Sequence, residues 1–410
     1  MWTRTYGTVG ADHGVAGQAY QGGSLLTGSV SVGPWGGYDI VLIRLDSYGN
    51  ELWTKYYGTP EWDLAHAMVS LDDGALVVGE SYGSGLLQGS GLVLRVDTDG
   101  DTLWTRTILV GGATKCHGAC RAQDGGFYLV GERTDPQDDL DAFITKMDQS
   151  GALEWTYVFD GDSTDVLRSV VQNTSGALVA IGGTASDGPV EQILLLSVND
   201  QGQFLWQQLI GNTADASGSE VRLAPGSGYV FTGYNTLNLG ERDMILTTTD
   251  AGGGFLLGNN FGDGSPADGL SVDTVSGGGF VVAGWLEGQG PGVRAMYVVR
   301  TDANGQTASL DVEPYIDPLP VPEGASSSIG LHLFPNPARS GDAITVRMSG
   351  RIIGPWTGAL LDQQGRSVAL WTAVAVEEPL VLPPLAPGTY VLQLDRVDGG
   401  RMSTRLCILP

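Results

Sequence analysis

Short runs of alternating apolar and polar residues, separated by glycine and aspartate, fill the first three quarters of the chain. In the stretch 60–110, four such runs cover 64–71, 75–81, 91–97 and 102–107. Asp-Gly pairs follow the first and the third run, and this pair between apolar runs is the strongest short signal for a β-hairpin. No stretch has helical periodicity. The pattern therefore predicts four short antiparallel strands in each such stretch.

This four-strand unit repeats along the chain with a period of 51 or 52 residues. Two sets of residues mark the period, glycines in the second run and tryptophans in the fourth: Gly28, Gly79, Gly131, Gly182, Gly233 and Gly284, and Trp53, Trp104, Trp155 and Trp206. Repeats of this length with four strands each are typical of β-propellers. We therefore expect an all-β chain in which residues 1–308 form a six-bladed β-propeller with four-stranded blades, the tryptophans packing in its core.

The two ends of the repeat region predict how the propeller closes. Trp2 lies 51 residues before Trp53, so residues 2–7 match the fourth strand of a blade that is otherwise missing. The sixth repeat has the opposite defect, because residues 306–310 lack the tryptophan. We expect residues 2–7 to supply the outer strand of the sixth blade, next to 294–301, since this leaves no open sheet edge.

After the sixth repeat the chain changes character. Residues 309–329 are rich in proline and serine, which predicts an extended linker. Residues 330–410 contain about seven alternating strands, which predicts a small Ig-like β-sandwich. A generic carbohydrate-binding sandwich is the alternative for this segment.

The repeat resembles a propeller repeat of large secreted bacterial proteins. The likeness rests on Asp-Gly-Gly-Phe-Tyr-Leu-Val-Gly at 124–131 and Asp-Ala-Phe-Ile-Thr-Lys-Met-Asp at 141–148. The Asp-x-x-Gly-x-x-x-Trp pattern at 46–53 also resembles quinoprotein-like repeats. That resemblance implies the blade fold and not a quinone site.

Three motifs near the C-terminus resemble the type A sorting domain of the type IX secretion system. Their residues include Pro335, Asn336 and Pro337, then Asp362 and Gly365, and then Gly388 and Tyr390. The resemblance implies that residues 330–410 engage the type IX secretion machinery, and that the protein is secreted or held at the outer cell surface. Such export requires a signal peptide, which does not precede the first repeat, so we expect the chain to be truncated at its start.

Charge and composition exclude several partners. The chain has 46 acidic and 21 basic residues and a net charge of −25, which argues against nucleic acid and anionic membrane surfaces. No apolar run approaches the roughly 18 residues of a membrane span. We expect no nucleic-acid partner, no membrane insertion and no cofactor.

Calcium is the one cation that the sequence suggests. Asp97, Asp99 and Asp101 resemble half of a calcium loop, but position twelve of that loop is Ile108 where an EF-hand needs glutamate. A hairpin turn is the favoured interpretation, and no metal site is predicted.

Polar residues on the predicted inner strands are candidate ligand-binding residues. His66, His117 and Arg168 occupy equivalent positions in three successive repeats, so they would line the central channel together. Two histidines without a paired carboxylate make a poor metal site. Aspartates also recur at the start of the inner strands: Asp12, Asp63, Asp165 and Asp268. They either form an acidic ring that attracts cations or cap their own strands, and capping is favoured.

Trp35, Trp62 and Trp285 fall in or beside predicted loops at one face of neighbouring blades. Clustered aromatic residues on a loop face would suit stacking on a sugar or contact with a cell-surface protein.

The chain contains no nucleophile elbow, Walker motif, zinc-protease helix or dinucleotide fingerprint. We therefore predict a secreted or surface-attached, non-catalytic module for binding or adhesion, with a glycan or a cell-surface protein as partner. One alternative is a secreted hydrolase or lyase that acts on polysaccharide through carboxylates at the channel mouth. The other is a structural spacer within a longer surface protein.

Overall fold

The computed structural model forms two compact units, Met1–Asp311 and Val312–Pro410, which are described separately. It describes residues 4–83, 89–136, 139–186, 188–211, 214–226, 228–236, 242–288, 293–307, 331–334, 338–348, 356–362, 366–374, 379–396 and 401–409. In these ranges the regular elements are strands, and no helix there is long and apolar enough to cross a membrane.

The first unit consists of six antiparallel sheets, each made of strands that are consecutive in the chain. The first three sheets are β1 (Asp12–Tyr20), β2 (Gly23–Val30), β3 (Asp39–Leu45) and β4 (Glu51–Tyr57); β5 (Asp63–Leu71), β6 (Gly74–Ser81), β7 (Ser90–Val96) and β8 (Thr102–Ile108); and β9 (Thr114–Arg121), β10 (Phe127–Thr134), β11 (Leu140–Met147) and β12 (Leu153–Phe159). The other three are β13 (Asp165–Gln172), β14 (Leu178–Thr184), β15 (Gln192–Val198) and β16 (Phe204–Ile210); β17 (Ala216–Leu223), β18 (Tyr229–Thr236), β19 (Arg242–Thr249) and β20 (Phe255–Phe261); and β21 (Ala267–Thr274), β22 (Phe280–Glu287) and β23 (Arg294–Arg300).

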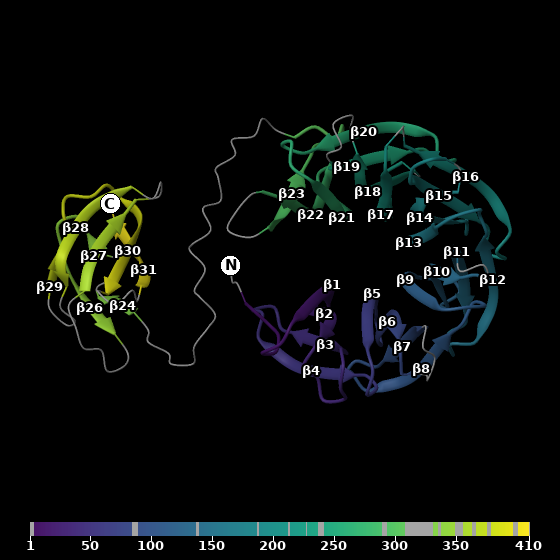
Figure 1. Ribbon diagram of the computed structural model, residues 1–410, viewed down its shortest axis with the longest axis horizontal. Coiled ribbons are helices and arrows are strands. Elements are labelled where there is room, and N and C mark those ends of the chain that lie inside the picture. The colour runs from purple at the N-terminus through teal and green to yellow at the C-terminus, as the bar shows by residue number, and fades with distance from the viewer. Residues whose placement is uncertain are drawn as a thin grey trace. The chain divides into compact units, whose positions relative to one another are not determined.

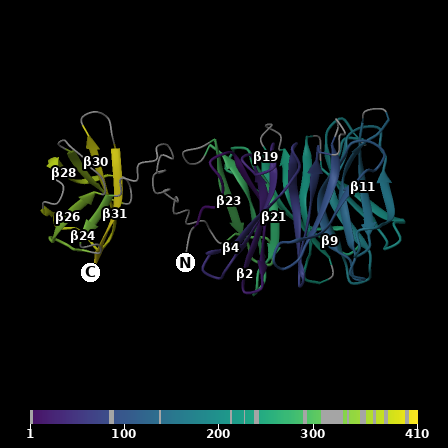
Figure 2. The ribbon, with the colours of Figure 1, turned by 90° about the horizontal axis from the view of Figure 1, so that it is seen from below.

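The sheets follow one another around a central space, with the first strand of each sheet innermost (Figure 1). The inner strands β1, β5, β9, β13, β17 and β21 neighbour one another in chain order. Seen from the side, the strands run between the two faces of the unit (Figure 2). Apolar residues of adjacent sheets, such as Leu42 and Val77, pack into shared clusters between the sheets. This is the propeller-type, four-stranded architecture that the repeat predicts.

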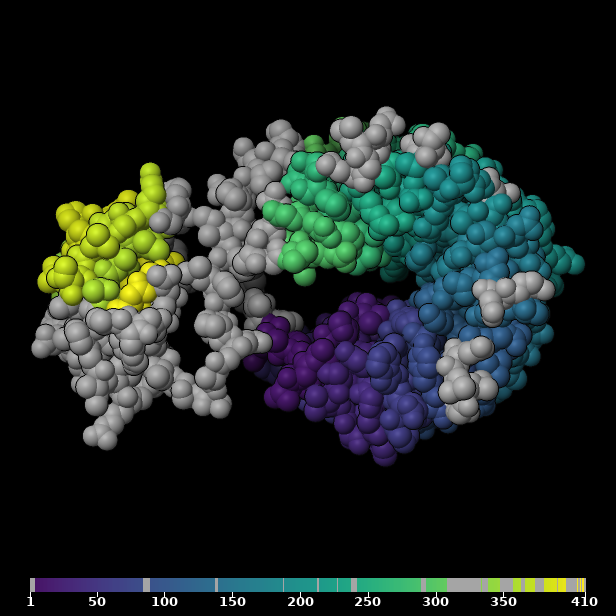
Figure 3. All heavy atoms as spheres, viewed as in Figure 1, coloured from purple at the N-terminus to yellow at the C-terminus, as the bar shows by residue number. Residues whose placement is uncertain are grey.

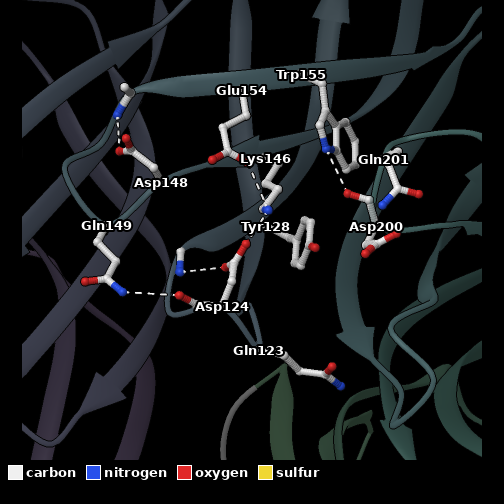
Figure 4. Close-up of polar contacts among 12 residues, drawn as sticks. Gln123, Asp124, Tyr128, Lys146, Asp148, Gln149, Glu154, Trp155, Asp200 and Gln201 are labelled. Atoms are coloured by element: carbon white, nitrogen blue, oxygen red, sulfur yellow. Dashed lines mark hydrogen bonds and ion pairs between the residues drawn. The ribbon is translucent and has the colours of Figure 1, made fainter.

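The tryptophans that mark the period join each sheet to the next. Trp155 lies against Gly202 in the turn before β16, where an added Cβ would come within 2.6 Å of the indole. Its Nε1 donates a hydrogen bond of 3.0 Å to the carbonyl of Asp200 in the same turn (Figure 4). Gly202 has φ +76°, a conformation that glycine adopts without strain. The repeat therefore needs a large ring and a glycine at this contact between sheets.

A second contact stabilises the hairpins of the first three sheets. In the third sheet, the buried Lys146 lies between the carboxylates of Asp124 and Glu154 (Figure 4). At the equivalent positions, Arg44 donates to the turn carbonyl of Gln21, and Arg95 donates to the carboxylate of Asp73 in the turn of its own sheet. These cations therefore stabilise turns and lie away from the central space.

The predicted closing strand is not formed in the described residues. Residues 4–7 pair with no strand there, and the sixth sheet has three strands, ending at β23. Arg4 donates to Asn50 (2.8 Å) and Tyr6 to the carbonyl of Gly49 (2.6 Å), so the segment contacts the first sheet through its side chains.

The second unit is a sandwich of two sheets around one apolar core. One sheet contains β24 (Leu331–Phe334), β26 (Ala343–Met348) and β29 (Pro379–Val381). The other contains β25 (Ala338–Arg339), β31 (Arg401–Leu409), β30 (Gly388–Arg396), β27 (Trp356–Leu361) and β28 (Ser367–Val374). Ile344, Leu360 and Leu392 are fully buried between them.

The motifs that suggest a sorting domain fall partly in this unit. Asp362 accepts hydrogen bonds from the backbone and side chain of Arg366, and Tyr390 donates to the carbonyl of Ala386 (2.9 Å). Gly388 opens β30. Pro335, Asn336, Pro337 and Gly365, together with the predicted linker 309–329, lie outside the described residues.

Candidate functional site

A β-bulge in each inner strand positions one side chain at the middle of the central channel. The bulge lies opposite the glycine that marks the period; Gly79, for example, pairs with Ala65, and His66 is the extra residue. A Cβ at Gly79 would lie 1.8 Å from the carbonyl oxygen of Leu64, so only glycine allows this close approach. Bulges redirect side chains and often lie near functional sites. The six bulge residues, which we call the waist, are Val15, His66, His117, Arg168, Ser219 and Leu270.

Two cavities meet at the waist and together form a channel. The cavity at the N-terminal ends of the inner strands has a volume of about 670 Å³, and the one toward their C-terminal ends about 540 Å³. All six waist residues line both cavities. The space-filling view shows the hollow at the centre of the first unit (Figure 3). The structure thus brings His66, His117 and Arg168 together at one narrow level of the channel.

Each waist histidine has a carboxylate partner, which the sequence analysis missed. Nε2 of His66 lies 3.4 Å from Glu80 and Nε2 of His117 lies 3.1 Å from Glu132. The two imidazoles are stacked, with ring centroids 5.1 Å apart. The premise that these histidines lack paired carboxylates is therefore wrong. A signal was present, because both glutamates directly follow a period-marking glycine and so sit beside the bulge.

The charges around His117 favour a neutral imidazole beside an ionised carboxylate. Burial, together with the charges of His66 and Arg168, lowers the pKa of His117 despite its glutamate partner. Burial alone would raise the pKa of Glu132, but His117 and Lys115 outweigh it and lower the pKa to about 2. Lys115 Nζ lies 3.3 Å from this carboxylate. We take the lysine to be the charge that keeps Glu132 ionised while His117 stays neutral near pH 7.

Two arginines line the N-terminal cavity next to these histidines. Arg168 donates to the hydroxyl of Ser217 (2.6 Å), and its guanidinium lies 3.9 Å from Glu191. Arg242 lies over the ring of Tyr234, 4.0 Å from its centroid. These contacts orient both guanidinium groups without a close bidentate carboxylate in the described residues. Such groups can bind a carboxylate or phosphate of a ligand.

Asp268 differs from the other aspartates at the start of inner strands. Asp63 accepts hydrogen bonds from the backbone and hydroxyl of Thr59 (2.6 and 2.7 Å), which is the predicted capping role. Asp165 likewise binds hydroxyl groups of Thr184 and Ser186. Asp268 lines the N-terminal cavity, and its Oδ1 has no hydrogen-bond partner among the described residues. Burial raises the pKa of Asp268 to about 6, although nearby arginines oppose the shift.

The three candidate tryptophans do not share one environment. Trp35 and Trp62 are exposed in loops, and Trp62 meets the ring of Tyr38 edge-on at 5.5 Å. Trp285 lies within β22, where the guanidinium of Arg294 stacks 3.9 Å from its ring. None of the three lines the channel cavities.

The acidic turn at Asp97 is a hairpin turn. Its carboxylate accepts hydrogen bonds from the backbone of Asp99 and Asp101 (3.0 and 2.8 Å), and Asp101 pairs with Lys55. Within the described ranges, no group of three or more His, Cys, Asp or Glu residues is placed to hold a metal ion.

Comparisons with solved structures place the chain beside β-propeller proteins. Puromycin hydrolase has a TM-score of 0.45 at 13% identity, over 96% of this chain and 58% of that chain. The propeller domain of the Trilobed protease from Pyrococcus furiosus, described as having an open velcro topology, gives 0.42 at 9%, over 96% and 95%. Acylaminoacyl peptidase from Pyrococcus horikoshii gives 0.35 at 10%, over 82% and 58%. The chain thus spans little more than half of the two peptidase-type enzymes.

No family model and no curated protein matches the chain. At these identities the structural likeness concerns the propeller fold alone. The predicted function nevertheless needs correction. Proteins named as a hydrolase and as a peptidase are among the neighbours, so the predicted non-catalytic binding or adhesion module is not supported. In the channel, His117 and its glutamate partner lie beside Arg168 and Arg242.

Proposed function

We propose that the protein is a hydrolytic enzyme and that its substrate, which carries an anionic group, binds in the N-terminal half of the channel. One observation carries the proposal: His117, with the ionised Glu132 behind it, faces the same 670 Å³ cavity as Arg168 and Arg242. The cavity volume lies within the range of about 300–1,000 Å³ that is common for small-molecule sites.

The two arginines supply the binding end of this site. Both guanidinium groups are already oriented, Arg168 by Ser217 and Arg242 by the Tyr234 ring. Pre-oriented planar cations bind a carboxylate or phosphate with little loss of side-chain freedom. Because the net charge of the chain is −25, binding of an anion depends on a local cationic site such as this one.

His117 is the proposed general base. A neutral imidazole accepts a proton from water, and a buried carboxylate beside it stabilises the imidazolium that forms. His117 and then Lys115 keep the pKa of Glu132 low, so that carboxyl does not take the proton itself. As the proton moves to His117, the water oxygen bonds to the electrophilic carbon of the substrate and the bond from that carbon to the leaving group breaks. The charged His117 then returns the proton to the leaving group, which restores the neutral imidazole.

Matched chromogenic substrates test this proposal. The panel pairs each anionic compound with a neutral analogue: mono-p-nitrophenyl succinate with p-nitrophenyl butyrate, the corresponding anilides, and p-nitrophenyl glucuronide with the glucoside. We expect the wild-type protein to turn over an anionic member faster than its neutral analogue. The Arg242→Gln variant should lose this preference. His117→Gln should lose about 100-fold or more in kcat.

Arg106→Gln is the control for loss of a cation, since Arg106 lies on the outer strand β8 and hydrogen-bonds a turn carbonyl. No turnover of any pair by the folded wild-type protein, or turnover that His117→Gln leaves unchanged, would argue against the proposal.

We also propose that the first unit is a six-bladed propeller closed by residues 2–7. The support is a repeated contact: Tyr6 donates to the carbonyl of Gly49 as Tyr57 of β4 does to that of Gly100. The N-terminal segment therefore meets the first sheet as a fourth strand meets the following sheet. Hydrogen–deuterium exchange tests this, because closure would protect alternate amides of β23 and an open edge would leave them fast.

We also propose, from the sequence motifs, that residues 330–410 form an Ig-like sorting domain of the type IX system. The protein would be exported through this domain. The separate core of the second unit supports it. A periplasmic reporter fused to residues 330–410 should reach the surface or medium of a bacterium that has this machinery, and the reporter alone should not. Retention of both in the periplasm would refute the assignment.

A further inference from the structure

We infer that the substrate is amphipathic: an aryl or branched alkyl group lies beside its anionic group, and the two contact opposite sides of the waist. This rests on the proposed function, because it concerns the same channel. The observation that carries it is the distribution of the six bulge residues.

The waist residues occupy one structural position but range from histidine and arginine through serine to valine and leucine. The period-marking glycine opposite each bulge is the same residue in all six repeats, because the backbone leaves no space for a Cβ. The bulge residue itself has no such constraint, since its side chain projects into the channel. Variation at this position within otherwise equivalent repeats therefore reflects what fills the channel rather than what the fold requires.

One side of the waist is cationic or polar and the other is apolar. His66, His117 and Arg168 come from three successive sheets, the second to the fourth. Leu270 and Val15 come from the sixth and the first sheet, and they are 54% and 40% exposed. Apolar side chains that remain exposed inside a channel favour binding of a ligand whose apolar group covers them.

Both cavities carry charged groups beyond the waist. The N-terminal cavity adds Arg242, Asp268 and Tyr234 to the waist. The cavity toward the C-terminal ends adds Arg121, Glu220 and Arg222 among small and branched apolar residues such as Val69. A ligand with its anion toward Arg168 and Arg242 would place its apolar group at Leu270 and Val15, on the other side of the waist. The 540 Å³ beyond the waist accommodates a ring or a branched chain.

Calorimetric binding of three small probes to the full chain tests the inference. The probes are 3-phenylpropionate, propionate and 3-phenylpropan-1-ol, which have both groups, the anion alone and the ring alone. We expect 3-phenylpropionate to bind at least about tenfold more tightly than either of the others. Leu270→Asn should remove the preference over propionate without changing the affinity for propionate, and Arg168→Gln should remove the preference over the alcohol.

Leu223→Asn is the matched control, since Leu223 is 39% exposed and lies at the end of β17 outside both cavities. Equal affinity for the two acids, binding of neither acid, or an equal effect of the two Leu→Asn variants would overturn the inference. Its failure is separable from that of the proposed function. Selective binding without turnover of any ester, anilide or glycoside would refute hydrolysis alone, whereas turnover with no preference for the phenyl acid would refute the amphipathic substrate alone.

Discussion

Removing the charge of Glu132 should cost the protein a large, pH-dependent part of its stability. The side chain is 11% exposed and lies 3.3 Å from Lys115 and 3.1 Å from His117. Burial opposes ionisation, but these partners lower its pKa from the usual 4.5 to about 2. At about 1.36 kcal/mol per pKa unit, the ionised form contributes about 3 kcal/mol at neutral pH.

The sign of the pH dependence follows from the direction of the shift. A carboxyl whose pKa is lower in the folded than in the unfolded state stabilises the fold above pH 4.5, and this contribution is lost as the pH falls toward 2. Glu132→Gln should therefore lower the free energy of unfolding by about 3 kcal/mol at pH 7 and by about 2 kcal/mol at pH 3.5.

Urea unfolding at both pH values, followed by tryptophan fluorescence, measures this effect. Eight of the ten tryptophans lie before residue 312, so the signal reports mainly on the first unit. The control is Glu154→Gln, which removes a 42%-exposed carboxylate from Lys146 while Asp124 remains, and it should cost less than about 1 kcal/mol. A loss for Glu132→Gln that is below about 1 kcal/mol at pH 7, or equal at both pH values, would refute the reasoning.

Three further changes probe other parts of the fold. The pKa of Asp268 is raised to about 6, so the contribution of its neutral form to stability is complete below pH 3.8 and is lost as the pH rises through 6. Asp268→Asn should therefore raise the free energy of unfolding by about 1–2 kcal/mol at pH 8 and leave it nearly unchanged at pH 4 in the same unfolding assay. Gly202→Ala should cost about 2–3 kcal/mol by calorimetry, because its Cβ would meet Trp155, whereas Gly176→Ala, with positive φ but open space, should cost only about 1 kcal/mol. Tyr6→Phe removes the hydrogen bond to the first sheet and should cost about 1 kcal/mol, seen as a lower Tm; an unchanged Tm would show that the segment is not held there.

The strands of the repeat could be predicted closely from the sequence. In the second repeat, the predicted runs 64–71, 75–81, 91–97 and 102–107 differ by at most one residue at each end from β5, β6, β7 and β8. Alternation and Asp-Gly turns are local signals, and they define strands whatever lies around them. The inner position of His66 and His117 could also be predicted, because the period places them on equivalent strands.

The partners of those histidines could not be predicted in the same way. Glu80 follows its glycine by one residue and looks like an ordinary polar strand position. The bulge at His66 directs the imidazole into the channel, where it lies 3.4 Å from the buried Glu80, and a bulge is visible in the pairing register and not in the pattern. The position of residues 4–7 was likewise decided by Tyr6 and Arg4, whose contacts with the first sheet lie more than 40 residues away in the chain.

The sequence by itself determined the all-β class, the period, the strands and the turns, because these depend on alternation and on residues that neighbour one another in the chain. Only the folded chain shows which charges meet beside the bulges, that Oδ1 of Asp268 has no hydrogen-bond partner among the described residues, and which apolar residues remain exposed in the channel. Those properties depend on strand register and on how the sheets pack around their centre, and neither is present in the local pattern.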